Sequence, residues 1–360
     1  MTAPIRVALV GAGDIGRGAH LPALLAHPQV ELAAIVEPSP VQRALIDAPG
    51  VPVLDDAEQL LADESVTAWV VATPPWVTPG LVRLAVEHGR HVLAEKPIAT
   101  SLAAAREAYG DLPPETAALL QVGFTYRHDP AIERLAELIA DGALGDPLQV
   151  RVIVYDELDD PLDREHAERM RATLAHGLPV IHEGAHVADW LRVLLGPEEL
   201  ALEHAWSLRT DPALPADNLC GASLAHPAGH RIELEIGWLL PAPVAGEITV
   251  RGRGGCATID VAAFSLRVES RAETAELVGA GDRTTRCFGR QLDRFVAHCR
   301  GERPTTPTGR PAVPLLADGL AALALSERLA EAMERGAPDR TAGGAGGPRD
   351  RPGAPAEATR

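Results

Sequence analysis

The segment Ile5–Gly16, IRVALVGAGDIG, constrains the fold of this chain more than any other. A run of strand-forming residues leads directly into three glycines and then into a helical pattern. Gly11 permits a tight turn from strand to helix, Gly13 lets backbone N–H groups approach a pyrophosphate, and Gly16 lets the helix pack close to the strand. The turn therefore predicts a dinucleotide site at a helix N-terminus. Its expected ligand contacts are Gly11, Gly13, Asp14, Ile15 and Gly16.

Glu37 is the second part of this predicted site. It follows a strand, Glu31–Val36, about twenty residues after the last glycine, where a carboxylate can accept hydrogen bonds from both ribose hydroxyls. Pro38 and Ser39 stand where an NADP site is expected to offer a basic residue, so the sequence favours NAD, while Arg43 keeps NADP open. The alternative interpretation is a plain strand-to-helix turn, with Glu37 as a solvated carboxylate.

The composition excludes several classes of protein. With 360 residues the chain is too long for one ordinary core and suits two domains, and 46% hydrophobic residues favour compact folding. A formal charge of −17 opposes binding to nucleic acid or to a membrane surface. The four cysteines, at 220, 256, 287 and 299, have no C-x-x-C spacing, and the sequence shows no signal peptide or membrane-spanning run. We therefore expect a soluble, cytoplasmic protein with reduced thiols.

Two patterns of secondary structure divide the chain. Strands that alternate with helices predict a parallel, doubly wound α/β sheet, that is, a Rossmann domain at residues 1–122. Longer alternating strands then predict an α+β domain at residues 123–335, with an open-faced, mostly antiparallel sheet. We expect helices at 184–195 and 288–299 to cover one face of this second sheet. Residues 336–360 are rich in Gly, Pro and Ala and are expected to be a disordered tail.

The expected elements follow from hydrophobic periodicity. In the first domain, after the amino-terminal strand, they are strands at 31–36, 51–53, 68–72, 91–94 and 118–123, and helices at 16–25, 41–46, 57–61, 79–88 and from 101 onward. In the second domain they are strands at 148–155, 203–208, 221–224, 232–238, 246–250, 256–261 and 265–268, and helices at 130–139, 184–195, 288–299 and 315–335.

Lys96 is the first candidate for chemistry. It ends the apolar run VLAEKP, at the carboxyl end of a parallel strand, where sites of α/β sheets are built. A desolvated ammonium at this point can bind a substrate oxygen and stabilise developing alkoxide charge. Thr73 and Pro74 end the preceding strand, so we expect them to share one crevice with Glu37 and Lys96. The alternative is a surface lysine paired with Glu95.

Several motifs together resemble the Gfo/Idh/MocA oxidoreductases, the family of glucose-fructose oxidoreductase and inositol dehydrogenase. The matching features are GAGDIG, Thr73-Pro74, Glu95-Lys96-Pro97, Tyr126-Arg127 followed by Pro130, GALGDP at 142–147, and Gly184-x-His186-x-x-Asp189, within roughly residues 4–335. The resemblance implies a Rossmann domain and a sheet domain that commonly forms the oligomer interface. It assigns catalytic roles to Lys96 and His186, and cofactor contacts to Thr73, Pro74, Glu95 and Lys96.

His182 is a departure from this family pattern. Many members have an aspartate at this position, which partners the lysine and positions substrate. If the segment is helical, His182, His186 and Asp189 lie on one face, and a histidine pair can take an alcohol proton. Core or capping histidines are the alternative. The same residues also spell H-E-x-x-H, so a zinc hydrolase with Asp189 as third ligand is a remote alternative; we expect no metal.

Further substrate contacts are expected where the two domains meet. Tyr126 and Arg127 follow the last Rossmann strand and are candidates to bind substrate, with Lys96, His182 and His186; an inter-domain salt bridge is the alternative for Arg127. Asp156, Glu157, Asp159 and Asp160 form an acidic loop that either recognises hydroxyls or amines or is a solvated face.

These interpretations combine into a functional hypothesis. We expect an NAD(P)-dependent dehydrogenase or reductase that interconverts a secondary alcohol and a ketone, by hydride transfer, on a sugar, cyclitol or related polyhydroxylated substrate. A cofactor-sensing regulator without turnover is the alternative from a different class, because fold does not imply function. The resemblance implies a homodimer or homotetramer formed through the carboxyl-terminal sheet.

Overall fold

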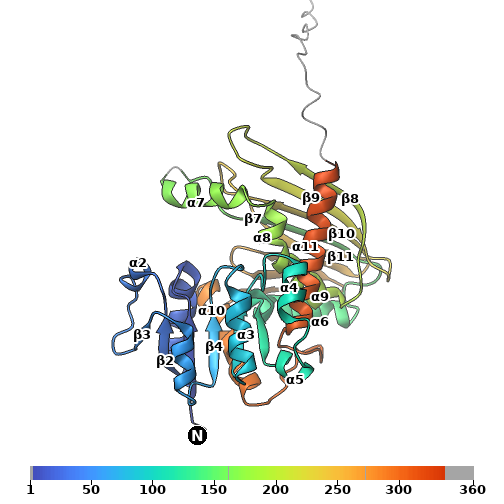
Figure 1. Cartoon of the computed structure of the whole chain (residues 1–360). Coiled ribbons are helices and arrows are strands. Elements are labelled where there is room, and N and C mark those ends of the chain that lie inside the picture. Colours follow the sequence, from blue (N-terminus) through green and yellow to red (C-terminus); the bar gives the residue numbers. More distant parts are fainter. Residues whose placement is uncertain (1–2, 161, 272, 337–360) are drawn as a thin grey trace, which may run out of the picture.

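The computed structural model describes residues 3–160, 162–271 and 273–336, which form two sheets with their helices (Figure 1). The predicted tail lies outside the described residues apart from Gly336, the last residue of the final helix. Within the described ranges, no helix combines the length and the apolar character needed to span a membrane. All four cysteines are free thiols.

The first sheet is parallel and has the strand order β3-β2-β1-β4-β5-β6, which confirms the predicted Rossmann topology. Its strands are β1 Ile5–Val10, β2 Val30–Val36, β3 Val53–Leu54, β4 Ala68–Val71, β5 His91–Glu95 and β6 Leu120–Gly123. β1 pairs with β2 on one side and with β4 on the other, so the winding reverses beside β1. Ligands of such sheets bind at this switch point, beyond the carboxyl ends of the strands. Gly11, Glu37, Thr73 and Lys96 all follow strand ends at this edge.

The helices of the first domain differ from the predictions mainly at their ends. They are a π-helical turn Gly16–His20 continued by α1 Leu21–Ala26, α2 Pro40–Arg43, a 3-10 turn Ala57–Ala62, α3 Thr78–Glu87, α4 Leu102–Tyr109 and α5 Pro114–Ala117. The last strand starts at Leu120 and not at 118, because α5 takes up the residues before it.

The second sheet has eight strands in the order β14-β13-β12-β11-β7-β10-β9-β8, antiparallel except for the β7–β10 pair. They are β7 Gln149–Tyr155, β8 Ala201–Leu208, β9 Leu219–Ala225, β10 Arg231–Gly237, β11 Glu247–Gly252, β12 Gly255–Asp260, β13 Ser265–Ser270 and β14 Thr274–Leu277. Alternate residues such as Val150 and Val152 are buried in the core, whereas Arg151 and Glu233 lie on an uncovered face. The predicted α+β fold is confirmed, and the oligomer contact expected on this face stays a prediction.

The helices after β6 are a 3-10 turn Thr125–His128, α6 Pro130–Ala140, α7 Arg164–Leu174, α8 Pro179–His182, α9 Gly184–Leu195, α10 Arg283–Cys299 and α11 Leu316–Gly336. The expectation that α10 covers the second sheet is wrong. Leu292 and Phe295 of α10 are buried in one hydrophobic cluster with Val7, Leu9 and Leu93 of the Rossmann sheet. Its apolar side therefore faces the first sheet, which its amphipathic pattern alone does not specify.

α9 and α11 connect the two hydrophobic cores. Ala185 and Ala188 of α9 pack in the Rossmann core, while Val187 and Trp190 belong to the core of the second sheet. α9 begins at Gly184, where a Cβ would lie 2.9 Å from Ser326 Oγ of α11. The close approach of these helices places the first turn of α9 at the junction of the two domains (Figure 1).

Candidate active site

The three glycines of the turn have two different functions. Gly11 has a positive φ of 95°, and a Cβ there would lie 2.4 Å from the carbonyl oxygen of Ala72. A Cβ on Gly16 would lie 2.2 Å from the carbonyl oxygen of Gly11. By contrast, no atom lies within 4 Å of a Cβ built on Gly13. Gly11 and Gly16 thus close the turn, and Gly13 leaves open space that fits a pyrophosphate.

Glu37 is held against this turn. Its side chain is buried, and its two carboxylate oxygens accept hydrogen bonds from the backbone N–H groups of Ala12 and Ser39, each at 2.9 Å. These bonds fix the carboxylate at the end of β2, where a ribose is expected. Arg43 lies nearby at the end of α2, and its guanidinium has no ion-pair partner among the described residues. The relative affinity for NAD and NADP stays a prediction.

The other expected cofactor contacts surround the turn. Asp14 and Ile15 are exposed at its mouth. Thr73 lies against Gly11, and its hydroxyl is 2.9 Å from that of Thr78, which fixes the loop after β4. Pro74 is exposed beside it. The structure therefore brings these four residues together at one edge of the sheet.

Glu95, the last residue of β5, fixes the end of this strand by hydrogen bonds. Its carboxylate is buried, with Oε1 2.8 Å from His20 Nε2, and Oε2 accepts the backbone N–H of Lys96 at 3.1 Å. Glu95 therefore links the strand end to the helix that begins in the glycine turn.

The ammonium of Lys96 reaches across to the second domain. It donates to the backbone carbonyl of His182 at 3.3 Å and lies 3.5 Å from Glu183 Oε1. Burial lowers the pKa of Lys96, but the carboxylates of Glu183 and Glu95 outweigh burial, and the net pKa lies above its ordinary value. Lys96 is therefore a stable cation and not a proton acceptor near neutral pH.

His182 and His186 do not lie on one continuous helix, because the helix is interrupted between them. α8 ends at His182 and α9 begins at Gly184. The His182 ring stacks on Trp238 with centroids 4.8 Å apart, and burial, followed by the charge of Lys96, lowers its pKa to about 4. The interruption directs Glu183 toward Lys96. The contact of Glu183 with Lys96 was not predicted from the sequence, although a glutamate beside the departure at His182 was the available signal.

His186 lies in the first turn of α9 and faces the ring of Tyr126, with centroids 4.7 Å apart. Its imidazole is buried and has no hydrogen-bond partner among the described residues. Burial, together with the charges of Lys96 and Arg283, lowers the pKa of His186 well below its ordinary value. The ring is therefore neutral near neutral pH and can accept a proton.

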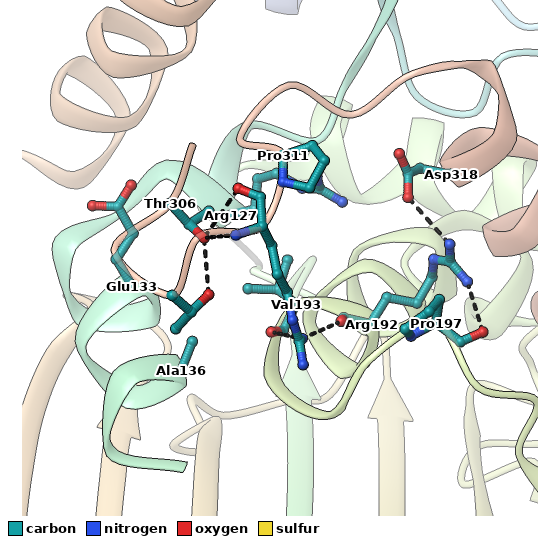
Figure 2. A pocket seen from close by; sticks show the side chains of 11 residues that line it. Arg127, Glu133, Ala136, Arg192, Val193, Pro197, Thr306, Pro311 and Asp318 are labelled. Atoms are coloured by element: carbon teal, nitrogen blue, oxygen red, sulfur yellow. Dashed lines mark hydrogen bonds and ion pairs between the residues drawn. The ribbon is translucent and has the colours of Figure 1, made fainter. Parts of the chain in front are cut away.

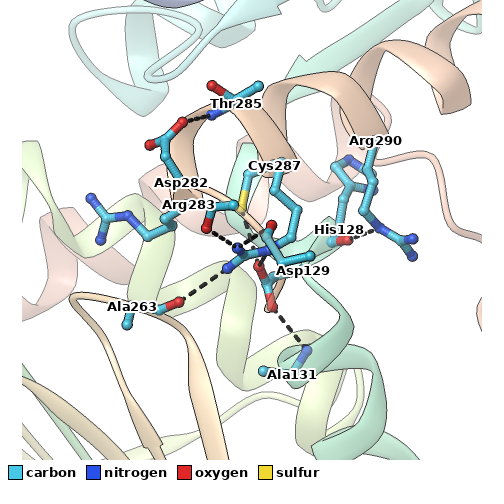
Figure 3. Close-up of polar contacts among 12 residues, drawn as sticks. His128, Asp129, Ala131, Ala263, Asp282, Arg283, Thr285, Cys287 and Arg290 are labelled. Carbon is cyan, nitrogen blue, oxygen red and sulfur yellow. Dashed lines mark hydrogen bonds and ion pairs between the residues drawn. The ribbon is translucent and has the colours of Figure 1, made fainter. Parts of the chain in front are cut away.

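Tyr126 is fixed from the other side by Arg283, whose guanidinium lies 4.8 Å from the centre of the tyrosine ring. Arg283 is the first residue of α10, and its guanidinium also donates to the backbone carbonyl of Val261 at 2.8 Å. Asp282 caps this helix by accepting hydrogen bonds from the N–H groups of Thr284 and Thr285, the second of which is drawn in Figure 3. Burial raises the pKa of Tyr126, so its hydroxyl stays protonated. These contacts fix the Tyr126 ring between Arg283 and His186.

Arg127 is placed differently from the other expected substrate contacts. Its buried guanidinium donates to both carboxylate oxygens of Asp189. It lines a separate cavity of about 260 Å³, together with Arg192 and Asp318 (Figure 2). Arg127 thus forms a buried salt bridge, as the alternative interpretation expected, but with a residue of its own domain and not across the domains. Its role in substrate binding stays a prediction.

The zinc interpretation needs ligands that converge on one point. His182 and His186 lie against different aromatic rings, and Asp189 is engaged by Arg127. Within the ranges the structure describes, no three His, Cys, Asp or Glu side chains are grouped so that they could hold a metal ion.

The acidic loop after β7 is mostly paired. Glu157 Oε2 lies 2.5 Å from His166 Nε2, and both oxygens of Asp159 accept from Arg171, at 2.6 and 2.7 Å. Asp160 accepts the backbone N–H of Leu162. Two of these carboxylates thus attach α7 to the end of β7.

Comparison with known proteins agrees with this geometry. Residues 5–124 match the model of an oxidoreductase family with an NAD-binding Rossmann fold, and residues 132–258 match the Gfo/Idh/MocA carboxyl-terminal domain. The two matches cover the greater part of the chain, which belongs to the Gfo/Idh/MocA family of oxidoreductases. The predicted family, enzyme class and NAD cofactor are therefore confirmed.

Individual relatives extend along nearly the whole chain. The rhizopine catabolism protein MocA of Rhizobium meliloti is 27% identical over 337 residues, which is 92% of this chain and 95% of the relative. Inositol 2-dehydrogenase 2 of Mycolicibacterium vanbaalenii is 26% identical over 348 residues, 93% of this chain and 94% of the relative. The structure of the WlbA dehydrogenase from Bordetella pertussis, in complex with NADH and UDP-GlcNAcA, has a TM-score of 0.74 at 22% identity and covers 94% of this chain and 97% of its own.

We predict that Gly13→Val abolishes NADH binding and leaves the fold intact. The valine side chain meets no protein atom near its Cβ, but it fills the space left for the pyrophosphate. Isothermal titration calorimetry measures the affinity, and thermal unfolding measures the fold. Gly11→Ala is the contrasting variant, which we expect to be destabilised because its Cβ meets the Ala72 carbonyl. Unchanged NADH affinity in Gly13→Val would contradict the assignment.

Arg127→Ala should lower the free energy of unfolding by about 3–5 kcal/mol, because it leaves the Asp189 carboxylate buried without its partner. The more exposed Arg192–Asp318 pair provides the control, since Arg192→Ala should cost only about 0–1 kcal/mol. Urea unfolding measures both. A raised KM with unchanged stability would instead make Arg127 a substrate-binding residue.

Proposed function

We propose that this enzyme interconverts a secondary alcohol and a ketone on a sugar, a cyclitol or a related polyhydroxylated substrate. The observation that carries the proposal is the grouping of three side chains: the Lys96 ammonium, the Glu183 carboxylate 3.5 Å from it, and the imidazole of His186, which has no hydrogen-bond partner among the described residues. These groups can hold and deprotonate a hydroxyl. When bound, the nicotinamide supplies the hydride acceptor or donor.

Lys96 binds the reacting oxygen in this proposal. Its raised pKa keeps it cationic, and its position at the end of β5 is enclosed by both domains. As the hydroxyl is oxidised, negative charge develops on the oxygen, and a fixed ammonium donor stabilises this charge more strongly than water does.

His186 removes the hydroxyl proton in the oxidative direction and returns it in the reductive direction. Its low pKa makes it neutral, and the Tyr126 ring fixes its orientation. The nearby positive charges of Lys96 and Arg283 help to keep it deprotonated until substrate is bound.

Glu183 holds Lys96 in position, and we assign it the role of the aspartate that the family commonly has at position 182. The carboxylate comes from the next residue because the helix is interrupted there. His182, whose ring is stacked on Trp238, then serves as a positioning group on the substrate side.

The substrate class is supported by two similarities. The relative from Mycolicibacterium vanbaalenii is named an inositol dehydrogenase, and the WlbA structure contains the sugar nucleotide UDP-GlcNAcA. A screen of cyclitols, sugars and sugar nucleotides with NAD, followed by nicotinamide absorbance, tests the proposal. Turnover of such a substrate supports it, and a failure of the whole panel would contradict it.

A regulator that binds the dinucleotide without turnover is the second candidate. The observation that favours it is His182 in place of the family's aspartate. Any NAD-coupled turnover that depends on Lys96 excludes this candidate.

We predict that Lys96→Ala lowers kcat by roughly two to three orders of magnitude, the scale of one lost preorganised donor, with NADH affinity nearly unchanged.

His186→Ala should lower kcat by roughly two to four orders of magnitude, because it removes the proposed base. Because the neutral imidazole is the active form, wild-type kcat/KM should persist below pH 6.5 and fall as pH drops through the lowered pKa of His186. This acid limb should disappear in His186→Ala; an unchanged limb would place the base elsewhere.

Glu183→Gln should lower kcat roughly tenfold, as expected when a hydrogen bond to a charged group is weakened. It should also shift the alkaline limb of the pH profile to lower pH, because the carboxylate raises the pKa of Lys96. Glu183→Asp, which keeps the charge, is the control and should retain the wild-type limb. A reduced kcat with no shift of the limb would show that Glu183 acts without Lys96.

A further inference from the structure

α7 is an element of the second domain that reaches the dinucleotide turn of the first. It lies between β7 and α8 in the sequence and extends in Figure 1 toward the side where α2 lies. Arg169 Nη2 of α7 is 3.5 Å from Asp14 Oδ2, within the glycine turn. Asp14 directly follows Gly13, and no atom lies within 4 Å of a Cβ built on Gly13.

α7 is attached through its apolar side, and Arg169 lies on its exposed side, near the open space beside Gly13. Leu174 and Met170 anchor the helix in a small hydrophobic cluster with Leu214, Trp238 and Leu239, apart from the two main cores. The guanidinium of Arg169 is half-exposed. Among the residues that the structure describes, its partners besides Asp14 are Glu165 and His166 of its own helix.

The charges beside the turn favour an additional cation when a pyrophosphate is present. Asp14 carries a carboxylate next to the position where phosphate oxygens are expected, and this repulsion must be offset. Arg17 is already occupied by the carbonyl oxygen of Ala12 and the side chain of Gln42, besides Asp14. Arg169 is held more loosely, because its contacts with Asp14 and Glu165 are both 3.5 Å long, and its planar fork matches phosphate oxygens.

We propose that Arg169 is a ligand of the dinucleotide pyrophosphate, contributed by the second domain, and that Asp14 holds it beside the site. α7 then covers the glycine turn, and both domains bind the cofactor. The inference depends on the NAD-binding fold and not on the proposed reaction.

Calorimetric titration of the full chain with NADH tests this inference. Arg169→Ala should weaken NADH binding about ten- to hundredfold, the value of a hydrogen bond to a charged group. Arg164→Ala is the matched control, because Arg164 is an exposed arginine of the same helix with no side-chain partner among the described residues. It should bind NADH like the wild type.

Two competing ligands show which part of the cofactor Arg169 recognises. ADP-ribose contains the pyrophosphate and adenosine does not. Arg169→Ala should therefore lower the affinity of ADP-ribose, measured by its competition with NADH, and leave the affinity of adenosine unchanged. Arg169→Lys, which keeps the charge without the planar fork, should be intermediate, and it replaces the alanine variant if that variant fails to fold.

Equal NADH affinity in Arg169→Ala and wild type would overturn the inference. An equal loss of NADH affinity in Arg164→Ala would also overturn it, because that result indicates a general effect of charge. An equal loss of adenosine affinity in Arg169→Ala would do the same. Failure of the wild type to bind NADH would overturn the cofactor assignment as well. Loss of sugar or cyclitol turnover with intact NADH binding would concern the proposed reaction alone.

Discussion

The buried ion pair between Arg127 and Asp189 is the interaction on which the arrangement of the site depends. It joins the turn after β6 to α9, and both charges are removed from water. Either charge alone would be costly at this position, so the two segments are stable only in this register. Tyr126 precedes Arg127, and His186 lies one turn before Asp189. The pair therefore sets the contact between the tyrosine and histidine rings at 4.7 Å.

The local features of the dinucleotide site could be predicted from the sequence because each depends on residues close together in the chain. The glycines, Glu37 and Lys96 directly follow strands whose hydrophobic pattern is clear. The carboxyl ends of parallel strands share one edge, so knowledge of the strands was sufficient to group these residues.

The features that the sequence analysis missed depend on contacts between distant residues. All four side chains of β14 are exposed, so it has no alternating pattern, and among the described strands it pairs with β13. α7 buries Ala167 and Leu174, with Met170 partly buried between them, and this apolar stripe is short in an otherwise polar helix. The role of Glu183 requires the interruption before Gly184, which lies where α9 approaches Ser326 of α11 closely. α10 shows a clear apolar side, but only the tertiary structure specifies which sheet it contacts.

The return of α10 and α11 to the first sheet has a consequence for the order in which the chain acquires structure during synthesis. Phe295 and Leu323 complete hydrophobic clusters most of whose members come from the amino-terminal domain. The amino-terminal domain leaves the ribosome long before these residues are made, so its apolar surface stays uncovered until the chain is nearly finished. A domain that is first in the sequence is thus among the last to become fully packed, and exposed apolar surface of this kind favours aggregation.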